Sequence, residues 1–483
     1  MKEARRASEK LAAGARSIFS LKTRFGENHM TQDLHDLDRR HLLHPVTEFR
    51  IHEIKGPRIV RGAKGIRLEM EDGRHVIDGF SGLFNINVGH GRQEIADAVS
   101  DQMRELAYYP SFWDFSSEIA IRLAARLAAL FPKDRELDHF LFTTGGSDAN
   151  ETNIRLARLY HAVRGEPKRQ KILSRRSSFH GITRAAGSAT TLPAYHIFSE
   201  PDPLHVAGAA PYCHRCEFGK VRSECGLECA QDIETVIETE GPEQIAAIIA
   251  EPVLGTGGIV PSPDGYFEKL QEICARYGIL LILDEVITGF GRTGAWFGME
   301  QWGIRPDLVS FAKGITSGYA PLGGIGMSTP VYETIRDRSP KGLPFMGGLT
   351  YNNHPTSCAA AMANLDILER EGLVENARIV GQHLLERLRD ALGGHDLVSD
   401  IRGIGMLAAI ECTQPGTLLP VGGKPMAFPA AVSKACWERG LIVRALWENV
   451  AIAPPLPTTN AEADEIADIL IDSFQEVAGQ TSR

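Results

Sequence analysis

Apolar residues recur at two spacings in the middle of the chain, from about residue 90 to residue 340. Over residues 117–131, alanines and leucines repeat every three or four positions, which predicts an amphipathic helix. Residues 279–283 are an unbroken aliphatic run, which is typical of a strand buried on both faces of a sheet. Because helical and strand-like segments alternate in this way, the pattern predicts a mainly parallel sheet covered by helices.

The same alternation gives approximate bounds for other elements. A short apolar run at residues 140–143 predicts a strand, and the helical spacing that follows Gly145-Gly146-Ser147 continues to near Gly165. Residues 267–277 predict another helix, and Gly278 ends it directly before the aliphatic run.

The elements become shorter after about residue 355. We expect helices over 357–371 and 432–439, strands over 405–411 and 441–444, and a final helix after Thr459. This predicts a second, smaller α/β domain. The chain then divides into an N-terminal extension, a segment that joins the small domain, a large domain and a C-terminal small domain, at residues 1–34, 35–85, 86–345 and 346–483.

The charge balance narrows the class of partner. Lys and Arg total 52, Asp and Glu total 61, and the formal net charge is −9, so nucleic acids and anionic membranes would be repelled. No stretch reaches the roughly 18 consecutive apolar residues of a membrane span. The first residues lack the apolar core of a secretory signal, so we expect a cytoplasmic protein. Met30 could be a second start, which leaves open whether residues 1–29 belong to the native protein.

The eight cysteines do not suggest a disulfide scaffold in a chain of this length. Four of them crowd together at Cys213, Cys216, Cys225 and Cys229. Their spacing would suit a tetrahedral zinc site, but such pairs also occur as free thiols. We predict no metal and keep structural zinc as the alternative.

Two residues after apolar runs are candidates for chemistry. Asp284 ends the aliphatic run, and the carboxyl end of a parallel strand is where α/β folds place their ligands. Lys313 closes a later apolar run before Gly314, and a desolvated lysine is a competent nucleophile toward a carbonyl cofactor. Each has an ordinary interpretation, since Asp284 could cap a turn and a lone lysine usually lies at the surface.

Two further segments add binding functions. Thr144-Gly145-Gly146-Ser147 opens a helix, and the unpaired N–H groups there suit a phosphate monoester, although a plain helix cap has the same composition. Phe179-His180-Gly181 offers an aromatic face on which a heteroaromatic ring could stack.

Together these segments give the chain a family resemblance. From about residue 35 to the end it resembles a class III aminotransferase, a pyridoxal 5′-phosphate (PLP) enzyme of fold type I. That resemblance implies a large domain with a seven-stranded, mainly parallel sheet and a smaller α/β domain. The motifs that carry it are Thr144–Glu151, Ser178–Gly181, Glu251-Pro252-Val253, Leu283–Gly294, Ala312-Lys313-Gly314 and Thr350–Pro355.

The resemblance also implies roles for single residues. Lys313 would bind PLP as a Schiff base and move the substrate proton, and Asp284 would face the pyridine nitrogen. Thr350 would contact the phosphate from the other subunit, which implies a homodimer and leaves open whether dimers pair into a tetramer. The remaining cofactor contacts would be made by Gly146, Ser147, Phe179, His180, Glu251 and Val286.

One motif points elsewhere and is set aside. Residues 289–294 fit the G-x-G-x-x-G fingerprint of dinucleotide-binding folds. That fingerprint must open a helix, whereas Ala295-Trp296-Phe297-Gly298 is a poor helix start and Pro306 follows soon after. We therefore predict a tight loop here and no NAD site.

Three residues bear on the substrate. Arg444 matches a movable arginine of amine:pyruvate (ω-) transaminases and would pair with the carboxylate of an α-keto acid, although a surface arginine at a strand end is the ordinary alternative. Phe84 and Trp113 fall where relatives place aromatic pocket walls. An apolar pocket favours an amine without an α-carboxylate.

The leading hypothesis is ping-pong transfer of an amino group from a primary ω-amine to an α-keto acid, with pyruvate as the expected acceptor. Residues 211–230 resemble a segment of taurine:pyruvate-like aminotransferases, so taurine is one candidate donor beside aliphatic amines, polyamines and β-amino acids. The alternatives are a PLP-dependent aminomutase or decarboxylase on the same fold, and a ligand-sensing domain of a regulator. The first 35 residues are too short for the DNA-binding module that such a regulator carries.

Overall fold

The computed structural model describes residues 33–413, 418–421 and 424–481. Most of the predicted N-terminal extension, residues 1–34, lies outside these described residues. Contacts divide the chain into two compact units, and the first comprises residues 33–61 and 70–73 of the described part. Within the described residues, no helix is long and apolar enough to cross a membrane.

The first unit is held by polar contacts more than by a core. Its helices α2 (Leu34–His41) and α3 (Phe49–Lys55) contain no buried residue. Asp38 accepts hydrogen bonds from the ring nitrogens of His44 at 2.9 Å and His52 at 2.8 Å, and these contacts tie α2 to α3 and to the loop between them.

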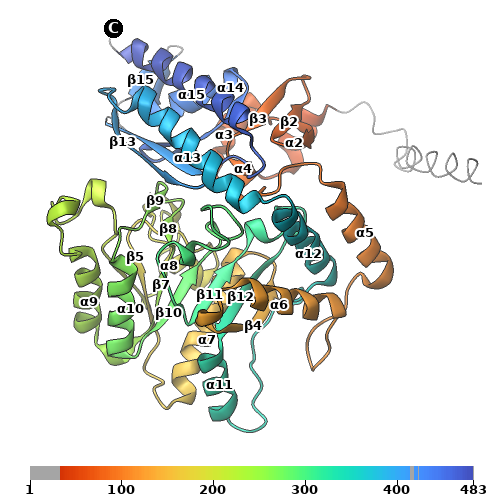
Figure 1. Cartoon of the computed structure of the whole chain (residues 1–483), viewed down its shortest axis with the longest axis vertical. Helices are drawn as coiled ribbons and strands as arrows, with labels where there is room; N and C mark the ends of the chain where they lie inside the picture. The colour runs from red at the N-terminus through yellow and green to blue at the C-terminus, as the bar shows by residue number, and fades with distance from the viewer. Residues whose placement is uncertain (1–32, 414–417, 422–423, 482–483) are drawn as a thin grey trace, which may run out of the picture. The chain divides into compact units, whose positions relative to one another are not determined.

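A seven-stranded sheet forms the centre of the second unit (Figure 1), in the order β4-β12-β11-β10-β7-β5-β6. The five strands from β11 to β6 are parallel to one another, and β12 is antiparallel to both of its neighbours. This confirms the predicted fold class, a mainly parallel seven-stranded α/β sheet. The strands are β4 (Leu137–Thr143), β5 (Lys171–Arg175), β6 (His205–Gly208), β7 (Ile245–Ala250), β10 (Leu280–Asp284), β11 (Leu308–Phe311) and β12 (Gly323–Ser328).

Helices cover both faces of this sheet. Along β10, Leu281 and Leu283 join one hydrophobic cluster, whereas Leu280 and Ile282 join another. The aliphatic run is therefore buried on both faces, as its composition predicts. The surrounding helices are α5 (Gln93–Leu106), α6 (Glu118–Leu130), α7 (Gly146–Val163), α8 (Arg184–Ala189), α9 (Glu228–Glu240), α10 (Tyr266–Tyr277), α11 (Thr329–Arg338) and α12 (Pro355–Arg370).

The C-terminal region, together with strands from residues 60–78, builds smaller sheets with their own helices. One sheet has the order β13-β14-β19-β18 and another the order β1-β2-β3-β17. The strands are β1 (Val60–Lys64), β2 (Arg67–Met70), β3 (His75–Asp78), β13 (Val398–Ile404), β14 (Leu407–Cys412), β17 (Leu441–Ile442), β18 (Arg444–Leu446) and β19 (Asn449–Ile452). The helices of this region are α13 (Leu373–Leu392), α14 (Phe428–Glu438) and α15 (Asn460–Thr481), and the shorter elements are α4 (Ser81–Phe84), β8 (Val253–Leu254), β9 (Val260–Pro261), β15 (Leu418–Val421) and β16 (Lys424–Ala427).

One predicted strand is divided in the structure. The single strand expected over 441–444 is two strands in different sheets: β17 pairs with β3 in parallel, and β18 pairs with β19 antiparallel. Val443 lies between them and is buried. The glycine-rich stretch 289–294 lies in turns and starts no helix, which confirms the predicted loop.

Candidate active site

A cavity of about 380 Å³ opens at the carboxyl ends of the large sheet's strands. Segments far apart in the sequence meet there, because the loops after parallel strands converge at one edge of the sheet. The cavity brings together eight of the predicted residues: Gly146, Ser147, Phe179, His180, Glu251, Asp284, Val286 and Lys313.

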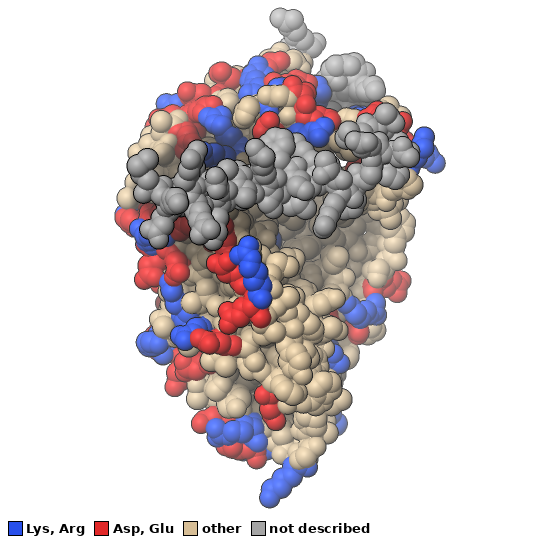
Figure 2. Space-filling model, turned by 90° about the vertical axis from the view of Figure 1, so that its right-hand side faces the viewer, with Lys and Arg blue, Asp and Glu red and all other residues tan. Residues whose placement is uncertain are grey.

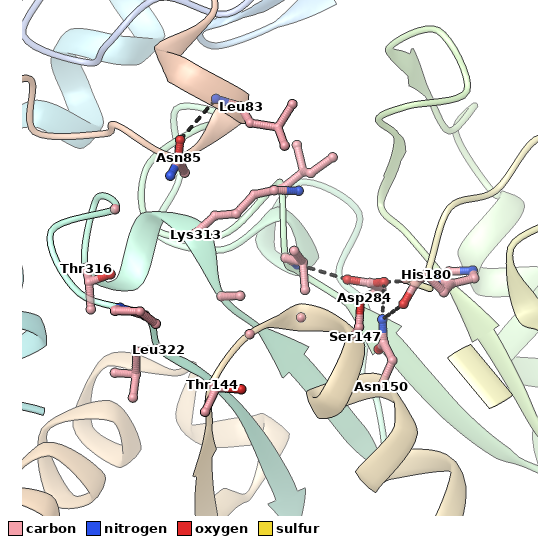
Figure 3. A pocket seen from close by; sticks show the side chains of 18 of the residues that line it. Leu83, Asn85, Thr144, Ser147, Asn150, His180, Asp284, Lys313, Thr316 and Leu322 are labelled. Atoms are coloured by element: carbon pink, nitrogen blue, oxygen red, sulfur yellow. Dashed lines mark hydrogen bonds and ion pairs between the residues drawn. The ribbon is translucent and has the colours of Figure 1, made fainter. Parts of the chain in front are cut away.

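Asp284 is fixed at the end of β10 by donors from two other elements (Figure 3). Its Oδ2 accepts hydrogen bonds from Asn150 Nδ2 at 2.7 Å and from the His180 ring at 2.9 Å. Its Oδ1 accepts from the backbone N–H of Val286 at 3.0 Å. A buried carboxylate with three donors has a defined orientation, so Asp284 presents a fixed negative group to the cavity.

The start of α7 forms another part of the cavity wall. The helix begins at Gly146 with no side-chain cap, so the N–H groups of its first turn have no partner inside the helix. A Cβ at Gly146 would lie 2.9 Å from Val286 Cγ2, so only glycine fits there. Asp148 is engaged elsewhere, accepting from the backbone N–H and the hydroxyl of Thr144 at 2.7 Å each. The donors at this helix end therefore suit an anion such as a phosphate monoester.

Lys313 follows β11 and opens a short 3-10 turn, Lys313–Ile315. Its φ is +48°, a conformation that is strained for a side chain other than glycine and that clusters at functional sites. Burial lowers the pKa of Lys313 to about 8, although the charges of Asp284 and Glu251 act in the opposite direction. Figure 3 shows its side chain extending across the cavity, so a partly neutral amine reaches the centre of the site.

Glu251 connects two backbone segments at the cavity wall. Its Oε1 accepts from the N–H of Phe179 at 3.1 Å, and its Oε2 accepts from the N–H of Gly255 at 3.0 Å. Burial raises the pKa of this carboxyl. Its hydrogen bonds fix the backbone of Phe179, whose ring packs edge-on against Tyr195. Glu251 therefore sets the position of the aromatic side chain expected to stack on the cofactor.

These groups fit PLP by their chemistry. One cavity holds a carboxylate for a ring nitrogen at Asp284, helix N–H groups for a phosphate at Gly146 and Ser147, and an amine for an aldehyde at Lys313. An aromatic side chain, Phe179, lines the same cavity.

Four predicted residues lie outside the lining of this cavity. Phe84 is buried beside it, with its ring centroid 5.8 Å from Lys313 Nζ, and the neighbouring Leu83 is the residue that lines the wall. Trp113 is 82% exposed. Thr350 is exposed, and its carbonyl accepts from Tyr108 Oη at 2.5 Å. Arg444 is exposed, and its Cζ lies 5.9 Å from the Phe80 ring centroid.

Asn150 is a site residue for which the sequence predicts no role. It donates to both Asp284 and the carbonyl of His180, the latter at 2.8 Å. The signal that could have found it is its spacing, since it lies one turn after Gly146 on the same face of α7.

The cysteine stretch does not converge on a metal geometry. Among the residues that the structure describes, the only three His, Cys, Asp or Glu side chains whose ligand atoms all lie within 4.8 Å of one another are Asp38, His44 and His52. Cys213 is exposed, Cys216 and Cys225 are half-buried, and Cys229 is buried in α9.

Comparisons with known proteins show the family of this chain. The family model for class-III aminotransferases matches residues 52–474. A diaminobutyrate–2-oxoglutarate transaminase of Halomonas elongata is 40% identical, over 90% of this chain and 94% of its own length. A putrescine–pyruvate aminotransferase of Pseudomonas aeruginosa is 36% identical, over 93% of this chain and 98% of its own.

A solved structure extends the likeness to the fold. The omega transaminase from Pseudomonas jessenii, in complex with PMP, superposes with a TM-score of 0.87 at 34% sequence identity. The match covers 93% of this chain and 99% of that one.

Proposed function

Because the chain belongs to the class-III aminotransferases, a family of PLP enzymes, we propose that it transfers the amino group of a primary ω-amine to an α-keto acid, with pyruvate as acceptor. The observation that carries this proposal is Arg444. Its guanidinium makes no hydrogen bond or ion pair with any residue that the structure describes, and it contacts Phe80, whose ring centroid lies 4.3 Å from that of Phe84. Phe84 in turn lies beside Lys313.

An arginine without a partner beside the site is suited to a carboxylate that comes and goes. In the proposed reaction, the ω-amine donor has no α-carboxylate and the α-keto acid acceptor has one. The same part of the substrate site must therefore accept an apolar group in one half-reaction and an anion in the other. A guanidinium binds a carboxylate through two parallel hydrogen bonds. A side chain held only by an aromatic contact can turn toward the keto acid and away from the amine.

The chain's own residues would then divide the work. PLP, when bound, supplies an electron sink for the bond that is broken at the substrate carbon. Asp284 would hold a negative charge against the ring nitrogen, and the N–H groups of Gly146 and Ser147 would hold the phosphate. Lys313 Nζ, with its lowered pKa, would take the proton from the substrate carbon and return it as general acid.

A homodimer is the second part of this proposal. Tyr108 bonds Thr350, and the Tyr108 and Tyr351 rings lie 5.8 Å apart, so the segment between α5 and α6 lies beside the segment between α11 and α12. Figure 2 looks onto the side where α5 and α12 lie in Figure 1 and shows a broad area with few charged side chains. The exposed apolar side chains of the two segments are Tyr109, Trp113, Phe115, Leu343, Phe345, Met346, Leu349 and Tyr351.

Such a concentration of exposed apolar side chains usually marks a protein interface. We propose a second copy of this chain as the occupant, because Thr350 belongs to this surface and not to its own chain's cavity. In the partner it would meet the phosphate end of the opposite site.

The acceptor is the point at which the relatives differ. The name of the Halomonas elongata relative specifies 2-oxoglutarate, and the name of the Pseudomonas aeruginosa relative specifies pyruvate. The purified enzyme is first reacted with an amine, so that its cofactor carries the amino group. Pyruvate should then take this amino group faster than 2-oxoglutarate does, in a half-reaction followed by the cofactor's absorbance. A clear preference for 2-oxoglutarate would make that the acceptor, and no return with any keto acid would favour an aminomutase or decarboxylase.

The donor needs a separate screen. Putrescine, taurine, diaminobutyrate, β-alanine and a simple aliphatic amine, each tested with pyruvate and alanine detection, cover the classes that the sequence and the relatives leave open. The apolar contribution of Leu83, Pro321 and Leu322 to the cavity favours the simple aliphatic amine over putrescine and taurine, each of which carries a second charged group.

A further inference from the structure

Arg402 is the most densely bonded side chain outside the cavity. It lies on β13 and is 8% exposed. All three guanidinium nitrogens donate, and besides a residue of their own strand they reach four other parts of the chain. The acceptors are Ile259 O at 2.9 Å, Gly258 O at 2.6 Å, Asn449 Oδ1 at 2.6 Å, Tyr212 Oη at 2.8 Å, Asp400 Oδ2 at 2.9 Å and Glu411 Oε2 at 2.5 Å.

Two of these contacts reach the wall of the active site. Gly258 and Ile259 lie in the loop between β8 and β9, and the start of the same loop, Gly255, donates its N–H to Glu251. A Cβ at Gly258 would lie 2.8 Å from Asn449 Nδ2, and its φ is +119°. The loop therefore approaches so closely that only glycine fits at this point.

A third contact reaches the hairpin that carries Arg444. In this hairpin β18 pairs with β19, with Arg444 opposite Ala451 and Leu446 opposite Asn449. Asn449 accepts from Arg402 and donates to Leu446 O at 3.1 Å, so its side chain closes the turn of the hairpin.

The hairpin is tied to the same loop a second time. Trp447 Nε1 donates to Thr256 O at 3.0 Å. Through these two ties, the backbone under Arg444 is fixed against the wall that holds Glu251. The Arg444 guanidinium itself has no polar partner among the described residues. The backbone of Arg444 is therefore held in place, while its guanidinium can move.

The charge of Arg402 has its own partner. Glu411 is fully buried and accepts from Arg402, Arg215 and the hydroxyl of Tyr212. A lysine at position 402 could keep the contact with Glu411 but could not span from Glu411 to Asn449 and Gly258, because it lacks the planar fork of guanidinium donors. Charge compensation and bridging can therefore be separated by substitution.

We propose that Arg402 is a positioning residue for the acceptor half-reaction, which holds the Arg444 hairpin so that Arg444 can reach the carboxylate of the keto acid. This inference rests on the proposed function of Arg444. It predicts that Arg402 affects acceptors with a carboxylate and leaves acceptors without one largely unaffected.

The test compares two acceptors in the acceptor half-reaction. It uses the holoenzyme after its cofactor has taken the amino group from a donor. Pyruvate carries the carboxylate, and propanal has the same number of carbons and a reactive carbonyl but no carboxylate. Arg402→Lys and the milder Asn449→Ala should each lower kcat/KM for pyruvate at least about tenfold, the effect of a lost charge-assisted contact, and change that for propanal less than about twofold. The matched control is Arg169→Lys. Arg169 bonds the carbonyls of Pro242, Ile245 and Tyr277 beside the seven-stranded sheet, which is not the sheet that contains Arg402. Its substitution should leave the ratio of the two kcat/KM values unchanged.

A double variant tests whether the effect of Arg402 on pyruvate depends on Arg444. In an Arg444→Ala background, Arg402→Lys should cause no further loss with pyruvate, because its effect passes through Arg444. Calorimetric binding of oxamate, an unreactive molecule with the shape of pyruvate, should weaken by the same factor in Arg402→Lys and in Arg444→Ala.

Two results would overturn the inference: an equal loss with pyruvate and propanal, which a purely structural role would give, or additive losses in the double variant. If Arg402→Lys does not fold, Asn449→Ala alone decides between these outcomes. If the wild type uses pyruvate and Arg444→Ala uses it equally well, the proposed role of Arg444 itself is refuted.

Discussion

The ring Nδ1 of His180 lies 2.9 Å from Oδ2 of Asp284, and both side chains are almost completely buried. Asn150 bonds the same oxygen and the backbone of His180. The three residues come from three elements, so the carboxylate cannot rotate without breaking contacts on both sides. A group that must face one ring nitrogen needs this kind of fixed orientation.

Asp284→Asn should lower activity by about 10²- to 10⁴-fold, because the negative charge opposite the cofactor ring is lost while the shape is kept. His180→Phe and Asn150→Ala should have smaller effects, since they free the carboxylate but keep its charge. Steady-state kcat with cofactor content measured in parallel separates lost chemistry from lost cofactor. Equal activity of Asp284→Asn and the wild type would contradict the role given to this residue.

Lys313→Ala should abolish the visible absorbance of the attached cofactor and lower activity by about 10³-fold or more, because no other described amine lines the cavity. Lys269→Ala is a suitable control, since Lys269 lies on α10 away from the cavity and its ammonium bonds Glu272. If the band persists in Lys313→Ala, another lysine carries the cofactor.

The lowered pKa of Lys313 predicts how cofactor attachment depends on pH. Burial moves the pKa from its ordinary value down to about 8, so the amine is charged below that pH and neutral above it. Only the neutral amine attacks an aldehyde. The rate at which apo-enzyme takes up PLP should therefore rise with pH and level off above about 8. A rate that keeps rising to about pH 10 would indicate an ordinary lysine.

The apolar surface formed by the segment between α5 and α6 and the segment between α11 and α12 predicts a dimer that a single charge can weaken. Met346 is 79% exposed there, and Met346→Asp would bury an unpaired carboxylate on association. We expect the dissociation constant to rise about thirtyfold or more, measured by analytical ultracentrifugation. Ile379→Asp, on α13, should leave it unchanged. A wild-type chain that stays monomeric at micromolar concentration would contradict the proposal.

The sequence predicts best what local chemistry determines. The buried strand before Asp284, the glycine start of α7 and the apolar run before Lys313 each have a local signature, and the structure brings all three to one cavity. The division at Val443 has no such signature, because the sheet that a short strand joins depends on which partner lies nearby. Asn150 is an ordinary helical amide until Asp284 and His180 are placed beside it.

Contacts between distant segments were beyond prediction for the same reason. Arg402, Glu411 and Tyr212 form one hydrogen-bonded cluster, yet nothing in the residues around any of them indicates the other two. Two predicted residues show the limit from the other side. The substrate residue Trp113 and the phosphate contact Thr350 are both exposed in the single chain, and the predicted role of Thr350 depends on a second copy.

The place of Thr350 outside its own chain's cavity has a genetic consequence. If each site takes its lysine from one chain and its threonine from the other, two inactive proteins can repair each other. In a mixed dimer of one Lys313→Ala chain and one Thr350→Ala chain, one of the two sites would carry both defects and the other would be intact. Co-expression of two such alleles would then restore activity that neither produces alone.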